Sequence, residues 1–286
     1  MKIVFSAAAG TVFLFGSALD ARGAMFASKV VSYEPGNASV TNPSFTDPSA
    51  ALGAPDGMSG VEAGFPNVLS PFSPAFDVGQ IVIIGEGGEL TLQFAKPVLG
   101  GSGPAIGVIS NSGLIDTNYP SGQAGNPAGN FGGGSADVSV SADDVHWVSL
   151  GEKEFLNPAN FYLNAGPYDA TPPASPQLAD FGKPFTGTLA SFNGENDAQV
   201  LATLAGSGGG TWLDLSGSGL AEISFIQFSV PADGTSFGGT IGSRLPIDAI
   251  AVANDHVGDL PEPASLSFLL GAAGLMLRRR QPAGDA

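Results

Sequence analysis

Residues 80–94, QIVIIGEGGELTLQF, contain the clearest strand signals in the chain. Residues 81–84 are continuously apolar, which is typical of a strand covered on both faces. The second half, ELTLQF, alternates polar and apolar residues, the period of a half-buried strand. Between the two halves, residues 85–88 read GEGG and predict a tight turn. We therefore predict a β-hairpin over this stretch and an antiparallel sheet around it.

Three further stretches carry strand patterns. In residues 136–150, ADVSVSADDVHWVSL, alternating valines lead to an acidic turn at residues 143–144 and then to a return strand. Residues 221–230, AEISFIQFSV, and 245–253, LPIDAIAVA, place apolar side chains on two faces. We predict that all four stretches are mostly strand. The side chains that we expect to be largely buried are Ile81, Ile83, Leu92, Phe94, Val140, Trp147, Phe228 and Ile250.

The composition favours a loop-rich β protein. The 286 residues include 42 Gly and 22 Pro, and 43% are hydrophobic. The chain has no cysteine, so burial and not disulfides must stabilise the fold. Residues 152–196 are a long excursion, and residues 197–204 predict a short helix that Gly206 ends. We predict an all-β fold, a single antiparallel β-sandwich of jelly-roll-like form over residues 25–259.

The second half of this body resembles discoidin-like, galactose-binding-like β-sandwiches. The resemblance covers residues 136–253. It rests on a serine, an acidic turn and Trp147 in the strand–turn–strand unit, and on a penultimate strand followed by the last strand with IDAI at 247–250. In that family a glycine usually follows the turn acid, whereas this chain has Asp144. The resemblance implies a β-sandwich for which glycan binding is a candidate activity.

The N-terminus carries an export signal. Met1-Lys2 is followed by a mostly apolar stretch that continues to Leu19. A positive start followed by an apolar stretch is typical of a secretory signal peptide. We predict that residues 1–24 form a signal helix, with cleavage between Ala18 and Ala27. A retained membrane anchor is the alternative.

The C-terminus, residues 260–286, has three parts in fixed order. Pro261-Glu262-Pro263 comes first, an apolar run at residues 266–277 follows, and the arginines Arg278, Arg279 and Arg280 close it. This order resembles the PEP-CTERM sorting signal of exported bacterial proteins. The resemblance implies that an exosortase-type membrane enzyme recognises and processes the tail.

The physical properties of the tail agree with a transient membrane anchor. Residues 264–277 carry no charge, and as a helix they span roughly 21 Å. A bilayer core is about 30 Å thick, so arginines that snorkel toward the headgroups must extend the reach. Three positive charges after the run favour a cytoplasmic C-terminus. An ordinary core helix is the alternative, although such a helix should show a polar face.

The charge of the chain limits its partners. Ten Lys and Arg stand against 26 Asp and Glu, a net charge of −16. Nucleic acid is excluded as a partner because binding it depends on cations at the phosphates. Neutral glycans and divalent cations remain compatible with such a surface.

We therefore expect a non-enzymatic protein of the cell envelope, outer surface or extracellular matrix. Its body would be a binding or structural module, with glycans as candidate ligands that Trp147, Trp212 or a tyrosine could stack against. The alternative is a secreted polysaccharide-acting enzyme, a hydrolase or lyase, which would need two carboxylates that meet only in the fold. A serine-hydrolase pattern, GTSFG at 234–238, is followed by no helix, so we interpret it as a loop.

Asp248 is the acid with the clearest expected role. It shares strand parity with Ile250 and Val252 and therefore points toward the core or its rim. A buried carboxylate needs donors or a cation. One hypothesis is a structural Ca²⁺ ion shared with Asp47 and Asp56. The alternative is a hydrogen-bonded acid or an ion pair with Arg244.

Overall fold

The computed structural model describes residues 24–232 and 244–259. The N-terminal signal at residues 1–23, the GTSFG stretch and the sorting motif (Pro261, Glu262, Pro263, Arg278, Arg279 and Arg280) lie outside the described residues. No helix within the described ranges is long and apolar enough to cross a membrane.

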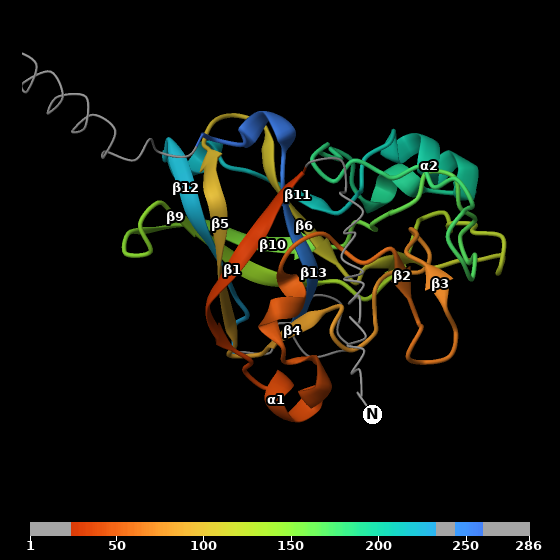
Figure 1. Ribbon diagram of the computed structural model, residues 1–286, viewed down its shortest axis with the longest axis horizontal. Helices are drawn as coiled ribbons and strands as arrows, with labels where there is room; N and C mark the ends of the chain where they lie inside the picture. The colour runs from red at the N-terminus through yellow and green to blue at the C-terminus, as the bar shows by residue number, and fades with distance from the viewer. Residues whose placement is uncertain (1–23, 233–243, 260–286) are drawn as a thin grey trace, which may run out of the picture.

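The described chain is mostly β-strand (Figure 1). Nine strands join in one antiparallel arrangement of order β10-β9-β12-β5-β1-β13-β6-β11, with β4 paired to β13. Their bounds are β1 (Met25–Glu34), β4 (Val82–Gly85), β5 (Glu89–Leu99), β6 (Pro104–Ser110), β9 (Gly134–Ser141), β10 (Trp147–Phe155), β11 (Thr211–Asp214), β12 (Glu222–Ser229) and β13 (Arg244–Val252).

Smaller elements decorate this arrangement. Two short pairs join β2 (Met58–Ser59) to β3 (Asn67–Val68), and β7 (Gly113–Leu114) to β8 (Asn130–Phe131). Figure 1 shows α2 and the β2–β3 pair beside the main strands, on the side away from β9 and β12. The helical elements are α1 (Ala38–Thr41), α2 (Asp197–Leu204), η1 (Pro43–Phe45), η2 (Pro48–Ala51), η3 (Leu189–Phe192), η4 (Ser216–Ser218) and η5 (Asn254–His256).

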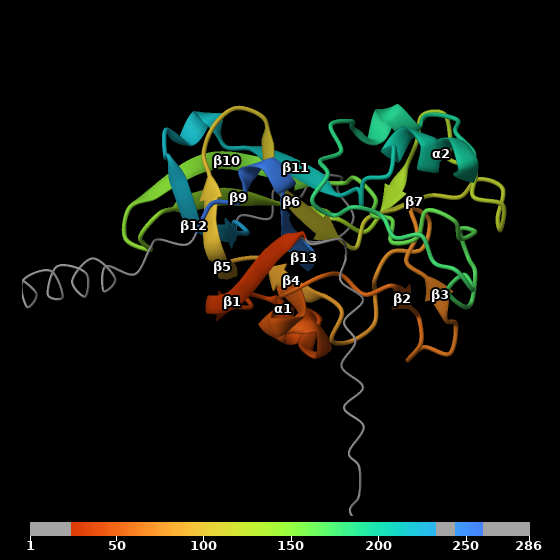
Figure 2. The same ribbon diagram turned by 45° about the horizontal axis from the view of Figure 1, so that its top comes forward.

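Strand β1 ties two layers of strands together. Its first residues, Met25 and Phe26, pair with Val252 and Ala251 of β13, and from Ala27 onward it pairs with β5. The layers therefore share one strand, and the sheet curls on itself (Figure 2). The main core lies between the two layers, because strands of both contribute fully buried side chains to one cluster, among them Ile84, Ile106 and Ile250 from one layer and Leu92, Val138 and Ile226 from the other.

The hairpin predicted at residues 80–94 is wrong in its pairing, although both strands exist. β4 pairs with β13, whereas β5 pairs with β1 and β12. The GEGG segment between them is therefore a crossing from one layer to the other. Its Gly88 is needed for this path, because a β-carbon there would lie 2.7 Å from the carbonyl oxygen of Glu34. Alternation along each strand is the same in both arrangements, so the sequence pattern did not distinguish them.

The other strand predictions are confirmed. β9 and β10 form the predicted hairpin, with Val148 opposite Val140. β12 and β13 occupy the two C-terminal stretches. Seven of the eight side chains that were expected to be buried are buried, and the exception is Trp147, which is half-buried because β10 is an edge strand.

The predicted helix at 197–204 is confirmed as α2. Asn196 caps its N-terminus by accepting a hydrogen bond from the backbone N–H of Gln199, and the Gln199 side chain bonds back to the N–H of Asn196. The helix ends at Ala205, which takes a left-handed conformation (φ 52°), and Gly206 follows. The buried Val200 and Leu204 pack α2 into a satellite core with Phe192.

Candidate functional site

A cavity of about 540 Å³ lies where the curled sheet fails to close. The two ends of the strand order are β10 and β11, so among the described residues each has one edge without a strand partner. Glu154 of β10 and three residues of β11, Thr211, Trp212 and Asp214, line this cavity together. The backbone N–H of Asn157, just after β10, donates to Oγ1 of Thr211 at 3.4 Å and links the two sides. We call this space the seam cavity.

Trp212 forms an aromatic wall of the seam cavity. Its indole N–H donates to the carbonyl oxygen of Gly209 at 2.9 Å, so the polar edge of the ring is satisfied inside the protein. The residue opposite it on β6 is Gly107, and a β-carbon there would come within 2.7 Å of the indole. The ring therefore lies against bare backbone on one side. The half-buried side chain is held in a fixed orientation in the cavity wall.

The cavity carries one carboxylate from each edge strand. Asp214 is exposed and accepts hydrogen bonds from the backbone N–H groups of Ser216 (2.7 Å) and Gly103 (3.2 Å). The bond from Ser216 is the main cause that holds the pKa of Asp214 below its ordinary value, so this group stays ionised. Glu154 is exposed on β10, and within the described part of the chain its carboxylate has no hydrogen-bond or ion-pair partner.

Residues 185–190 from the long excursion form the third wall of the seam cavity. Phe185 stacks on Phe192, with ring centroids 5.3 Å apart and planes at 27°. The side-chain amide of Asn157 donates to the carbonyl oxygen of Gly187 at 3.1 Å. Thr188 caps η3 in a reciprocal arrangement with Ser191. These contacts fix a wall that sequence reasoning treated only as a loop.

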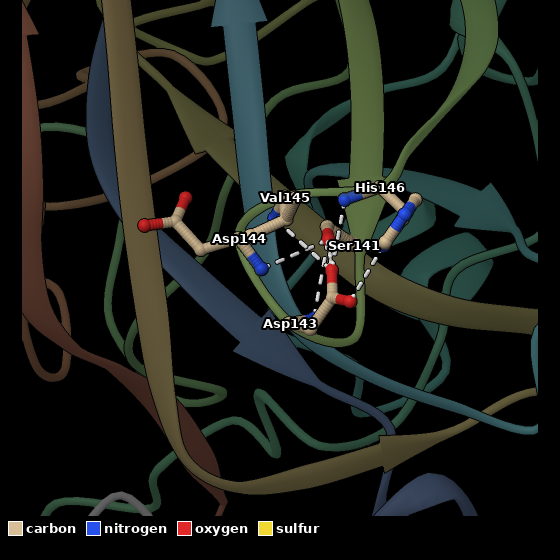
Figure 3. Close-up of polar contacts among 5 residues, drawn as sticks. All are labelled: Ser141, Asp143, Asp144, Val145 and His146. Carbon is tan, nitrogen blue, oxygen red and sulfur yellow. Dashed lines mark hydrogen bonds and ion pairs between the residues drawn. The ribbon is translucent and has the colours of Figure 1, made fainter.

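The acidic turn between β9 and β10 is organised around Asp143 (Figure 3). Its Oδ1 accepts from the backbone N–H groups of Val145 (3.0 Å) and His146 (2.8 Å), and its Oδ2 lies 2.8 Å from Nδ1 of His146. The backbone N–H of His146 is the leading cause that lowers the pKa of Asp143. Ser141 accepts from the N–H groups of Asp143 and Asp144.

Asp144 occupies the position where the discoidin-like sandwiches that this segment resembles usually have glycine. Its φ is 64°, a left-handed conformation that glycine adopts with least strain. Its carboxylate points away from the hydrogen-bonded group in Figure 3. The turn therefore keeps its shape with aspartate, at a cost in backbone strain. The turn does not line the seam cavity.

The structure buries Asp248 almost completely, at 3% exposure. Its Oδ2 has no hydrogen-bond partner, and it forms no ion pair with Arg244 within the described residues. Burial is the main cause that raises the pKa of Asp248 well above its ordinary value, and the nearby Asp56 raises it further. The partly exposed Asp56 also has a raised pKa, chiefly because it is partly buried.

The three acids of the calcium hypothesis are only partly brought together. Asp56 is close enough to Asp248 to repel it. Asp47 instead caps η2, where its Oδ1 accepts from the backbone N–H (2.9 Å) and the hydroxyl (2.7 Å) of Ser49. No group of three or more His, Asp or Glu side chains in residues 24–232 and 244–259 could hold a metal ion. A cation at Asp248 and Asp56 would therefore need main-chain carbonyl ligands.

From the sequence, Trp212 was predicted as a residue that could stack against a glycan, but the other residues that line the cavity were not predicted. One signal was present, since Trp212 and Asp214 are two positions apart on one strand and such residues share a face. Nothing in the sequence marked Glu154 as a site residue. It lines the cavity only because β10 and β11, which are far apart in sequence, come together in the fold. No protein-family model matches the chain, and no curated protein matches its sequence.

Proposed function

We propose that the protein is exported to the cell envelope or extracellular matrix and sorted by its C-terminal tail. The positive, apolar N-terminus and the fixed order of the three sequence parts at the C-terminus support this proposal. An exosortase-type enzyme would process the segment at Pro261-Glu262-Pro263 while residues 266–277 anchor the chain in the membrane. Moving Arg278, Arg279 and Arg280 across the bilayer would cost roughly 2.5–3.5 kcal/mol each, which would hold them on the cytoplasmic side.

The experiment that tests sorting compares size and fractionation in a native-type host. Replacing the three arginines with serine should weaken membrane retention, and Glu262→Ala should block processing while the fold stays intact. A mature protein with its full C-terminus that is recovered as soluble in both wild type and the arginine variant would contradict the proposal.

We also propose that the body is a jelly-roll-like sandwich that binds glycans in the seam cavity. The observation that carries this proposal is the gathering of Trp212, Glu154 and Asp214 in one cavity between the two edge strands. An aromatic face stacks against the apolar face of a sugar ring, and nearby polar groups take its hydroxyls. Thr186, Thr188 and Thr211 supply hydroxyls in the walls.

A polysaccharide-acting enzyme is the second candidate, because two carboxylates line the same cavity. Glycoside hydrolysis needs one carboxyl group that stays protonated as a general acid, usually through a raised pKa. Asp214 is unsuited to that role, since its pKa is lowered by hydrogen bonds from the backbone. Binding is therefore the function that the geometry favours, with Glu154 as the acid that the enzymatic alternative would require.

The chain offers a matched test because it has only two tryptophans. On a glycan array, the purified full-length protein should bind, and Trp212→Ala should abolish binding. Trp147→Ala, on β10 outside the cavity, should leave binding unchanged. Equal loss in both variants, with folding retained, would contradict the assignment of the cavity. Release of reducing ends that Glu154→Gln abolishes would favour the enzyme.

A further inference from the structure

We propose that the seam cavity selects glycans that carry free amino groups, such as polymers of partly deacetylated amino sugars. This inference rests on the proposed glycan-binding function and names its ligand class. It starts from the placement of the two carboxylates. Glu154 comes from β10 and Asp214 from β11, so each edge strand contributes one negative charge to the same cavity.

The protein does not neutralise this pair of charges with basic side chains of its own. No lysine, arginine or histidine is among the residues that line the cavity. The hydrogen bonds that Asp214 accepts come from neutral groups, the backbone N–H groups of Ser216 and Gly103 and the side chain of Ser216. Glu154 has no partner at all within the described ranges. Inside the cavity itself, a balancing charge must therefore come from solvent or from a ligand.

His256 also contributes to the lowered pKa of Asp214. Its Nδ1 lies 2.8 Å from the carbonyl oxygen of Leu99, and its charged form interacts with Asp214. His256 is largely buried and does not line the cavity. A ligand cation would meet Asp214 from the cavity side and would not compete with the histidine for the same space.

The aromatic wall limits which cation fits. Trp212 lines the cavity with a flat ring that is held in one orientation. Such a ring can stack against a sugar ring, whereas a bare metal ion has no face to stack against it. A sugar with an ammonium group combines a stacking face with a charge that can hydrogen-bond to a carboxylate. Ammonium groups near tryptophan also gain a cation–π contribution. A protonated amino sugar therefore uses the apolar and the acidic walls together, whereas a neutral sugar brings no positive charge to the two carboxylates.

The test measures binding of the purified full-length protein to three oligosaccharides of equal length: deacetylated chitosan, N-acetylated chitin and a neutral glucan. Mildly acidic pH keeps the amino groups protonated, and Asp214 stays ionised there because its pKa is lowered. Chitosan oligomers should bind at least about tenfold more tightly than the other two, the scale of one charge-assisted hydrogen bond.

Glu154→Gln is the decisive variant because this side chain is exposed and forms no hydrogen bond or ion pair within the described residues. It should reduce chitosan affinity about tenfold and reduce the affinity for chitin and glucan by clearly less, so that the preference for chitosan narrows. Glu152→Gln is the matched control, since it removes the same charge from an exposed position of the same strand outside the cavity. It should have little effect on any of the three ligands.

The outcomes separate the two proposals. Equal affinity for all three oligosaccharides would overturn the amino-sugar inference and leave glycan binding standing. Equal losses in Glu154→Gln and Glu152→Gln would also overturn it, because attraction to the net charge of −16 would then explain the preference. Failure to bind any of the three, with Trp212→Ala indistinguishable from wild type, would contradict the proposed function itself.

Discussion

Trp212 lies opposite Gly107 in the β11–β6 pair, and its indole occupies the space that a β-carbon of residue 107 would fill. Such a β-carbon would lie 2.7 Å from Cε2 and Cζ2 of the ring. Atoms this close must move apart. The missing side chain at position 107 therefore determines how deeply the indole sits in the wall of the seam cavity.

Gly107→Ala should push the indole out of its place. We expect a loss of about 1–3 kcal/mol in the free energy of unfolding, typical of overpacking, together with weaker glycan binding and a shifted tryptophan emission. Gly217→Ala is the control, because a β-carbon at this exposed position of η4 meets nothing within 4 Å. If Gly107→Ala binds glycans as wild type does, the position of the indole is not what the ligand recognises.

Asp248 should make stability depend on pH. Its pKa is raised in the folded state, so the fold favours the protonated form. The stability that this group supports is complete below the ordinary value of 3.8 and is lost as pH rises toward the raised folded value. The slope is at most about 1.4 kcal/mol per pH unit. Asp248→Asn should flatten it, as urea unfolding at several pH values would show. An unchanged slope would mean that other groups, such as Asp56, determine the pH dependence of stability.

Calcium provides a separate test of the same residue. If Ca²⁺ binds at Asp248 and Asp56, the wild-type melting temperature should rise with calcium and fall with chelator. A ligand at 100 times its Kd stabilises by about 2.7 kcal/mol. Asp248→Ala should abolish the response, whereas Asp47→Asn should keep it, because Asp47 caps η2. Identical melting curves with calcium and with chelator would leave Asp248 as a protonated core acid.

Asp144 should be replaceable by glycine with a gain in stability. Its φ of 64° is strained for a residue with a side chain, and glycine relieves such strain by up to about 1 kcal/mol. Thermal unfolding of Asp144→Gly should show a raised melting temperature. Asp144→Ala should show a lowered one, because alanine tolerates this conformation less well than aspartate. A lowered value for glycine would show that the Asp144 carboxylate contributes contacts of its own.

The strands of this fold could be read from the sequence because their periodicity is local. Val140, Phe228 and Ile250 are buried as their patterns predict. The partner of each strand could not be read in the same way. β4 and β5 are neighbours in sequence, yet they lie in different layers, and the pattern on each strand is the same for a hairpin and for a crossing.

The seam cavity could not be predicted from the sequence for a related reason. Trp212 was recognisable as a possible aromatic platform, and Asp214 is two positions further along the same strand. Glu154 and the wall at residues 185–190 arrive from the other edge and from the long excursion. Their meeting depends on how far the sheet curls, which is a property of the packed core and not of any one segment.

If the protein is exported as proposed, the strand that ties the layers would limit where a leader peptidase can cut. Met25 and Phe26 are the residues of β1 that pair with β13, and they lie inside the cleavage window from Ala18 to Ala27. A cut after Phe26 would remove both residues that pair with β13, and a cut after Met25 would remove one of the two pairs. A processed protein that keeps both pairs would therefore begin at Met25 or earlier, and N-terminal sequencing of the form proposed to be exported would read its first residue directly.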